Sequence, residues 1–295
     1  MAPTLRGRPT VCVIDLEALR SNFRQIREKV GLKVKILSMV KANGYGHGAP
    51  TVAQTLAAEG SDAFGVATLE EGLELRQAGI RAPILVLAGT YIEQLDQYFE
   101  NGLTPVAHDL ESLRRLETAV QAHGATLKVH LKIDTGMGRL GLPATEIDSW
   151  LPALKKLKAL QIEGVFSHFS TAESVDGEYT QKQLATFNHV VKLLRAEAIA
   201  PPLVHLANSA ATITLPAAYF DMVRPGLMLY GIYPAAAMAN QIELKPVLSW
   251  QTRIVQLRKV PAGTSISYGQ TFVTERESLI ATLPVGYADG YSRLL

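Results

Sequence analysis

The sequence predicts an α/β protein: a (β/α)8 barrel of the TIM type followed by a smaller, mostly β domain. Eight apolar runs alternate with amphipathic stretches, which is the strand and helix count of such a barrel. From about residue 245 apolar and polar positions alternate between glycines and prolines, as in antiparallel strands. The 295 residues, 47% of them hydrophobic, can bury a full barrel core and still form a second unit. We expect the barrel over residues 11–240 and the second domain over 241–295, with residues 11–15 pairing with the second domain.

The first helix is predicted directly after a short strand at residues 11–15. Asp15 is a suitable N-cap because its carboxylate can accept hydrogen bonds from free amides of the first turn. In residues 16–30, LEALRSNFRQIREKV, large apolar side chains recur on one helical face. Similar patterns predict helices over residues 68–79, 109–124 and 178–199.

The eight strand candidates are short apolar runs. They are residues 35–41, 63–67, 84–88, 104–107, 127–133, 162–168, 203–206 and 220–223. In a barrel of this type the reactive groups lie in the loops at the carboxyl ends of the strands. Five polar residues fall at or just past such ends, so we expect them at one mouth of the barrel: Lys41, Asp134, His168, Asn208 and Arg224.

Charge and cysteine content narrow the functional classes. The net charge is +2, with 29 basic and 27 acidic residues and no basic run, so neither a nucleic-acid partner nor a membrane surface is expected. Cys12 is the single cysteine, which excludes internal disulfides and multi-cysteine metal sites, and no metal is expected. With no secretory signal and no long apolar run, we expect a cytoplasmic protein that acts on a small molecule.

The most distinctive stretch is MVKANGYGHG, residues 39–48. An apolar strand delivers Lys41 at its carboxyl end, and the glycines that follow let the loop backbone approach a ligand closely. An amine in that position can act as a nucleophile toward an aldehyde. The alternative is a strand-end lysine that extends to solvent, because buried charged groups are rare.

The residues after the lysine favour the first interpretation. VKANGYGHG closely resembles the segment that carries the pyridoxal-phosphate lysine in bacterial alanine racemases. The resemblance implies that Lys41 is bonded to the cofactor aldehyde and that Tyr45 lies beside the cofactor phosphate. Matching segments run from about residue 11 to residue 293, nearly the whole chain.

HLKIDTGMGRLG, residues 130–141, is a second informative segment. Along a strand, His130, Lys132 and Asp134 share one face, which would point into the barrel. Interior charges are costly unless paired, so one interpretation is a structural Lys132–Asp134 cluster. The segment also resembles its counterpart in the racemases. That likeness implies a carbamylated Lys132 paired with Arg139. It also implies that Arg139 contacts the phenolic oxygen of the cofactor and the substrate carboxylate. The rival role for Arg139 is that of an aldol-type or phosphate-clamp arginine.

Three further segments resemble the family. FSHFSTAES carries His168, which is either a hydrogen-bonded core residue or, by the resemblance, the residue that holds the site arginine. HLANSAAT opens a helix, where Ser209 is either a plain N-cap or a phosphate ligand, and Asn208 precedes it at the cofactor. VRPGLMLYG supplies Gly226 and Leu227, whose backbone would complete a phosphate cradle.

Arg224 distinguishes racemisation from decarboxylation and transamination. By the resemblance it faces the pyridine nitrogen of the cofactor. Because an arginine only donates hydrogen bonds, that nitrogen would stay unprotonated and the ring would be a weaker electron sink. Decarboxylation and transamination gain from a protonated ring, so Arg224 favours racemisation.

A racemase needs a base on each face of the α-carbon, and Lys41 would serve one face. SISYGQTF, residues 265–272, resembles the racemase segment whose tyrosine serves the other face from the second subunit of a dimer. Tyr268 is therefore the second catalytic candidate and a homodimer is expected. Without the resemblance, a tyrosine between strand residues is ordinarily a packing residue.

The resemblance as a whole implies interconversion of L-alanine and D-alanine, supplying D-alanine for cell-wall peptidoglycan. Two alternatives stay open. One is another enzyme on the same barrel, a broad-specificity racemase or an amino-acid decarboxylase; the decarboxylase would carry an acidic residue in place of Arg224 and a cysteine in the second domain. The other is a non-catalytic barrel that stores pyridoxal phosphate. Family members continue beyond the position of Leu295, so the second domain is expected to be partial, and the sequence is either a fragment or a protein that works with an incomplete domain.

Overall fold

The computed structural model describes residues 7–174 and 177–292, so residues 293–295 of the predicted second domain lie outside the described part. The chain divides into two compact units. One runs from Asp15 to Val247, and the other combines the residues up to Ile14 with those from Leu248 onward. The amino-terminal strand therefore belongs to the second unit.

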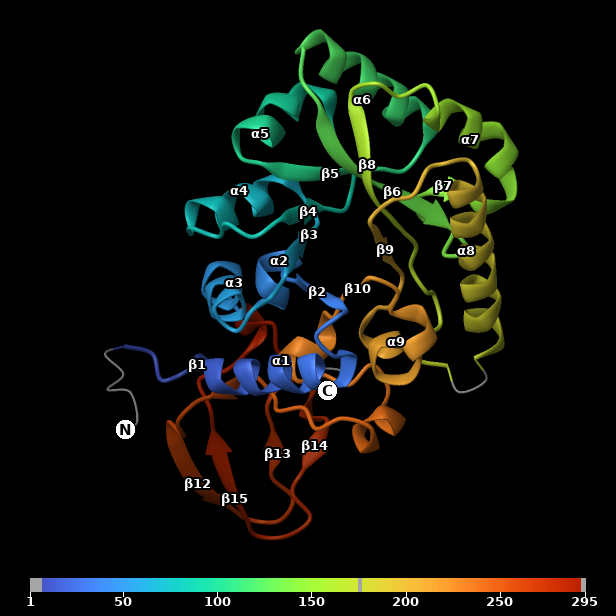
Figure 1. The fold of residues 1–295 in the computed structure, drawn as a ribbon. Helices are drawn as coiled ribbons and strands as arrows, with labels where there is room; N and C mark the ends of the chain where they lie inside the picture. The colour runs from blue at the N-terminus through green and yellow to red at the C-terminus, as the bar shows by residue number, and fades with distance from the viewer. Residues whose placement is uncertain (1–6, 175–176, 293–295) are drawn as a thin grey trace. The chain divides into compact units, whose positions relative to one another are not determined.

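The first unit contains a closed barrel of eight parallel strands (Figure 1). In barrel order these are β2 (Lys35–Met39), β3 (Ala63–Val66), β4 (Ile84–Val86), β5 (Leu103–Ala107), β6 (Leu127–Asp134), β8 (Leu160–Phe166), β9 (Leu203–His205) and β10 (Met222–Val223). Each strand pairs in parallel with the next, and β10 pairs with β2, which closes the barrel. The two-residue β7 (Leu142–Pro143) lies beside β6. Each of the eight barrel strands overlaps an apolar run found in the sequence, so the predicted fold class is confirmed.

Helices connect the strands, and several of them line the outside of the barrel (Figure 1). The α-helices are α1 (Leu16–Val30), α2 (Lys41–Tyr45), α3 (Ala49–Ala58), α4 (Leu69–Gln77), α5 (Leu95–Glu100), α6 (Leu110–Ala122), α7 (Ile147–Leu154), α8 (Glu178–Ala196) and α9 (Ser209–Thr214). Short 3-10 turns are η1 (Ile92–Gln94), η2 (Ala144–Glu146), η3 (Pro216–Ala218), η4 (Leu227–Tyr230) and η5 (Ala236–Asn240).

The helix starts follow the capping chemistry of the sequence. Asp15 caps α1, because its carboxylate accepts hydrogen bonds from the amides of Glu17 and Ala18 at 2.9 Å. Asp109 caps α6 in the same way. The predicted helix over residues 16–30 is therefore confirmed at both ends.

Apolar side chains fill the barrel next to its carboxyl-terminal mouth. A buried cluster joins residues from six different strands: Leu37, Met39, Ala63, Leu85, Val106, Phe166 and Met222. Tyr45 and Leu87 pack against this cluster. The cluster is a closely packed apolar layer next to the residues that follow the strand ends.

The second unit is built from short antiparallel pairs. β1 (Val11–Ile14) pairs with β11 (Leu248–Gln251), β12 (Gln256–Val260) with β15 (Ser278–Thr282), and β13 (Ser265–Ile266) with β14 (Phe272–Val273). Two 3-10 turns, η6 (Tyr268–Gln270) and η7 (Tyr287–Asp289), complete it. Val255, Leu257 and Phe272 are more than half exposed, so this unit presents an apolar surface.

Gly231 offers a test of the packing that holds the site loop. It ends η4 with φ 80°, and a Cβ atom there would overlap the carbonyl group of Lys245. We expect Gly231→Ala to lower the free energy of unfolding by about 2–4 kcal/mol, since overpacking adds to the cost of the left-handed conformation. Gly124→Ala is the control, because φ is 64° there but nothing lies within 4 Å of the added atom. Urea unfolding would measure both, and equal losses in the two variants would contradict the overlap with Lys245.

Candidate active site

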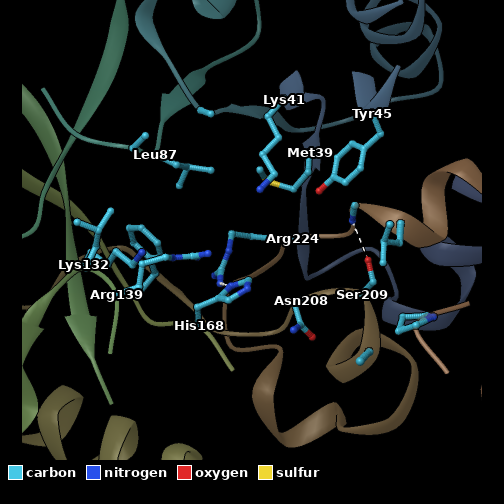
Figure 2. Close-up of a pocket in the computed structure, with 18 of the residues that line it drawn as sticks. Met39, Lys41, Tyr45, Leu87, Lys132, Arg139, His168, Asn208, Ser209 and Arg224 are labelled. Carbon is cyan, nitrogen blue, oxygen red and sulfur yellow. Dashed lines mark hydrogen bonds between the residues drawn. The ribbon is translucent and has the colours of Figure 1, made fainter. Parts of the chain in front are cut away.

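A cavity of about 530 Å³ opens at the carboxyl ends of the barrel strands (Figure 2). This is a typical volume for a small-molecule site. The parallel strands all point to this mouth, so residues far apart in the sequence meet there. Ten of the residues singled out in the sequence line the cavity: Lys41, Tyr45, Lys132, Arg139, His168, Asn208, Ser209, Arg224, Gly226 and Leu227.

Lys41 begins α2, a turn whose backbone is left-handed. Residues 42–45 have φ between 51° and 61°, and only Gly44 among them is a glycine. A left-handed helical backbone costs about 1–2 kcal/mol for each L-residue, so the surroundings must hold this turn in place. Lys41 and Tyr45, at the two ends of the turn, both line the cavity, with the amine 6.0 Å from the centre of the tyrosine ring.

A polar corner of the cavity, which we call the cradle, is formed by Tyr45, Ser209, Gly226 and Leu227. The Ser209 hydroxyl accepts a hydrogen bond from the Gly226 amide at 2.9 Å (Figure 2). A Cβ atom at residue 226 would lie 2.6 Å from the Tyr45 hydroxyl oxygen, so glycine is required for this close approach. Burial raises the pKa of Tyr45, which keeps its hydroxyl protonated and able to donate.

Asn208, not Ser209, is the N-cap of α9. The Asn208 side-chain oxygen accepts a hydrogen bond from the Ala211 amide at 3.0 Å. The interpretation of Ser209 as a plain N-cap is therefore wrong. The Ser209 hydroxyl belongs to the cradle instead.

Arg224 is 4% exposed and is surrounded by hydrogen-bond acceptors. One terminal nitrogen, Nη1, donates to Nδ1 of His205 at 2.9 Å. The other, Nη2, donates to the carbonyls of Ser167 and Leu206 at 2.6 and 3.1 Å and to Nδ1 of His168 at 3.3 Å. Within residues 7–174 and 177–292, no ion pair joins this guanidinium to a carboxylate. Burial lowers the pKa of Arg224 to about 9, so it is still cationic at neutral pH.

The histidines next to Arg224 are neutral. Burial, followed by the charge of Arg224, lowers the pKa of His168 to about 3 and holds the pKa of His205 well below its usual value. Because the guanidinium only donates, Nδ1 of His205 accepts and its Nε2 carries the hydrogen. That Nε2 donates to Nδ1 of His130 at 2.8 Å, and Nε2 of His130 then faces a carboxylate oxygen of Glu163 at 3.7 Å. A chain of ordered donors therefore runs from the cavity to Glu163.

Lys132 is buried, and it takes part in none of the ion pairs between described residues. The predicted Lys132–Asp134 cluster forms no ion pair among the described residues, although the charge of Asp134 acts to raise the pKa of Lys132. The Asp134 carboxylate accepts hydrogen bonds from the amides of residues 136–138 at 2.8–3.2 Å. Burial, followed by the positive charges of Arg139 and Arg224, lowers the pKa of Lys132 to about 8. A fraction of this amine is therefore neutral at physiological pH.

Tyr268 belongs to the second unit. It begins η6 and is 77% exposed, and the residue before it, Ser267, has φ 63°. Its phenol is therefore accessible rather than packed into a core.

Three side chains at the site were not predicted from the sequence. His205 is the last residue of β9, and this position at a strand end was the signal that could have identified it. Phe166 stacks on His205 with ring centres 4.8 Å apart and lies 5.1 Å from the Arg224 guanidinium carbon, but a phenylalanine in a strand carries no such signal. Glu173 is the one carboxylate among the described lining residues.

The described residues contain neither a candidate metal site nor a candidate membrane-spanning helix. No group of three or more His, Cys, Asp or Glu side chains there is placed to hold a metal ion. None of the helices in the same ranges has the length and apolar character needed to cross a membrane.

The described residues form an eight-stranded (β/α)8 barrel with Lys41, three other cations and a hydroxyl-lined cradle at its mouth. Such a mouth suits an anionic small molecule. Comparison with known families is more specific. Residues 14–234 match the family described as "Alanine racemase, N-terminal domain", and residues 247–295 match "Alanine racemase, C-terminal domain". The chain belongs to the alanine racemase family.

Individual relatives agree with this assignment. The chain is 46% identical over 288 residues to the alanine racemase of Halothermothrix orenii and 44% identical over 289 residues to alanine racemase 2 of Caldanaerobacter subterraneus subsp. tengcongensis. These alignments cover 98% of this chain and 76% and 74% of the relatives. A solved alanine racemase of Clostridium difficile 630 superposes with a TM-score of 0.90 at 36% identity, covering 98% of this chain and 76% of that one. A Bacillus anthracis alanine racemase with bound L-Ala-P gives a TM-score of 0.86 at 36% identity, with coverage of 98% and 75%.

The depressed pKa of Lys132 can be tested by removing a neighbouring charge. We expect Arg139→Gln to raise the pKa of Lys132 above about 8, because Arg139 is the largest charge that lowers it. Carbon-13 NMR of the lysine carbon next to the amine, in samples purged of carbon dioxide, would follow the titration. Lys128→Gln is the control, since Lys128 lies on the same strand but pairs with Glu163 at 2.7 Å. An unchanged or lower pKa in Arg139→Gln would contradict the assignment.

Proposed function

We propose that this chain, loaded with pyridoxal phosphate, is an alanine racemase that interconverts L-alanine and D-alanine as a homodimer. The observation that carries the proposal is the buried, donor-only Arg224 in the same cavity as the strand-end Lys41. The names of the relatives support the substrate, and we extend it to this chain as a proposal.

The residues present fit pyridoxal phosphate. The Lys41 amine would bond to the cofactor aldehyde. The Tyr45 and Ser209 hydroxyls with the backbone of Gly226 and Leu227 would hold the phosphate, and a side chain at residue 226 would fill the space in front of Tyr45. When bound, the cofactor supplies an electron-accepting ring that makes the α-hydrogen of the amino acid acidic.

Arg224 tunes how strongly that ring withdraws electrons. Its guanidinium would donate to the pyridine nitrogen, and it offers no acceptor and no transferable proton at neutral pH. His168 and His205 are held neutral and accept hydrogen bonds from Arg224, so they fix its orientation without adding positive charge. The residues around Arg224 therefore favour moving a proton on and off one carbon over breaking a carbon–carbon bond.

Arg139 would bind the substrate carboxylate and the phenolic oxygen of the cofactor, and Lys132 would hold Arg139 in place. The neutral fraction of Lys132 can react with carbon dioxide to give a carbamate and a proton, which converts a cation into an anion. Such an anion would pair with Arg139, an arginine with no carboxylate partner among the described ion pairs. This chemistry supports a carbamylated Lys132.

Two groups would move the proton. Lys41 would remove the α-hydrogen of D-alanine and return it on the same face. Tyr268, which we propose reaches the site of the other subunit, would serve the opposite face. Its exposure and the exposed apolar side chains of the second unit support association with another chain.

Chiral analysis of the product tests the reaction. The chain with pyridoxal phosphate should convert L-alanine to an equal mixture of enantiomers, and Lys41→Ala should lower the rate by about 10³-fold or more, because it removes both the linking amine and a base. Lys35→Ala, at the exposed amino end of the same strand, is the matched control and should keep the rate. Release of carbon dioxide would favour a decarboxylase, bound cofactor without turnover would favour a storage barrel, and equal conversion of L-serine would favour a broad-specificity racemase.

The role of Tyr268 can be separated from that of Lys41 by hydrogen exchange. In deuterated water, Tyr268→Phe should slow α-hydrogen removal from L-alanine by about 10²–10⁴-fold, while D-alanine still exchanges its α-hydrogen without inversion. Tyr287→Phe, another exposed tyrosine of the second unit, should change neither rate. Equal slowing for both enantiomers in Tyr268→Phe would rule out opposed bases.

A further inference from the structure

Glu71 ties together the ends of two neighbouring barrel strands. It lies in the first turn of α4, directly after β3, and is half-buried. One carboxylate oxygen, Oε1, accepts a hydrogen bond from the Ala42 amide at 2.6 Å. The other, Oε2, accepts from the amide of Ala67 at 2.7 Å and from that of Thr68 at 3.4 Å. Ala42 directly follows Lys41, so this carboxylate reaches the backbone that carries the cavity lysine.

The segment that Glu71 reaches is the left-handed turn at residues 42–45. Three of its four residues carry a side chain that disfavours this backbone, so the conformation persists only where contacts hold it. Its other hydrogen bonds are local, such as Gly44 amide to Val40 carbonyl at 2.8 Å and Ala49 amide to the Asn43 side chain at 2.9 Å. Glu71 differs because it fixes the turn to a separate strand and helix, with a charged acceptor that makes the hydrogen bond stronger than a neutral one.

A helix cap alone does not account for Glu71. Thr68 and Glu71 form a capping box, which uses the carboxylate only to accept from the residues before α4. Glutamine serves in capping boxes as well, so the box does not require the second oxygen that receives the Ala42 amide. The contact with Ala42 is additional to the capping role.

We propose that Glu71 is a positioning residue for Lys41: its carboxylate holds the left-handed turn against the end of β3 and thereby keeps Lys41 and Tyr45 directed into the cavity. Holding the turn is a property of the chain itself. Its consequence for the cofactor rests on the proposed attachment of pyridoxal phosphate to Lys41.

Glu71→Gln is the discriminating substitution. Its single amide oxygen can still complete the capping box, while the amide nitrogen, a donor, would then face the Ala42 N–H. Glu70→Gln is the matched control, because it removes the same charge from the same helical turn at an exposed carboxylate whose side-chain partners are Thr68 and Gln94. The Ala42 amide bonds Glu71 and not Glu70. In the cofactor-free chain, hydrogen–deuterium exchange of the peptide spanning residues 39–48 should be faster in Glu71→Gln than in Glu70→Gln.

Attachment of the cofactor gives a second measurement. Borohydride trapping and mass spectrometry of the Lys41 peptide should show attachment slowed about tenfold in Glu71→Gln, the size of effect expected when a charge-assisted hydrogen bond is lost. Glu70→Gln should match the unmodified chain. Equal exchange and equal attachment in the two variants would overturn the proposal.

A rescue variant separates positioning from general destabilisation. Glycine adopts a left-handed backbone without steric cost, so adding Ala42→Gly to Glu71→Gln should restore most of the attachment rate. Failure of this rescue would show that Glu71 acts only as a helix cap and would also overturn the proposal. If the unmodified chain attached no pyridoxal phosphate at Lys41, the proposed function would fail, while the exchange comparison in the cofactor-free chain would still decide whether Glu71 holds the turn.

Discussion

The site depends on one physical constraint: a buried guanidinium can only donate, so everything that touches Arg224 must accept. Two backbone carbonyls and two imidazoles meet that demand. Because Nδ1 of His205 must accept from Arg224, its Nε2 carries the hydrogen and donates to Nδ1 of His130. Nε2 of His130 then faces the Glu163 carboxylate. The polar interior of this barrel is therefore ordered by the hydrogen-bonding character of a single residue.

The second constraint is electrostatic. Four cationic side chains line the cavity against one carboxylate in the described residues, and burial adds to their mutual repulsion. Burial and this repulsion lower the pKa of Lys132 to about 8 and keep His168 neutral. A cavity of this kind gains stability from an anionic ligand, and a phosphate with an amino-acid carboxylate would supply the missing negative charge.

Backbone geometry completes the site. The left-handed turn after Lys41 and the close approach of Gly226 to Tyr45 are both conformations that most residues disfavour. The two features meet at Tyr45, which ends the turn and faces Gly226. A strained backbone of this type persists only where surrounding contacts hold it in place. Here Glu71 accepts a hydrogen bond from the Ala42 amide, and the Tyr45 ring packs against Tyr230 with ring centres 5.0 Å apart.

The sequence alone determined the barrel, the first helix with its Asp15 cap, and the meeting of Lys41, His168, Asn208 and Arg224 at one mouth. These features depend on local signals: apolar periodicity, capping side chains, and the rule that parallel strands share a carboxyl end. Only the tertiary structure decided that Asn208 caps α9, that Asp134 turns to backbone amides instead of Lys132, and that Glu71 reaches Ala42. These contacts depend on strand register and loop geometry. A hydrogen bond forms or fails over distances of a few tenths of an ångström, and no local sequence pattern encodes such distances.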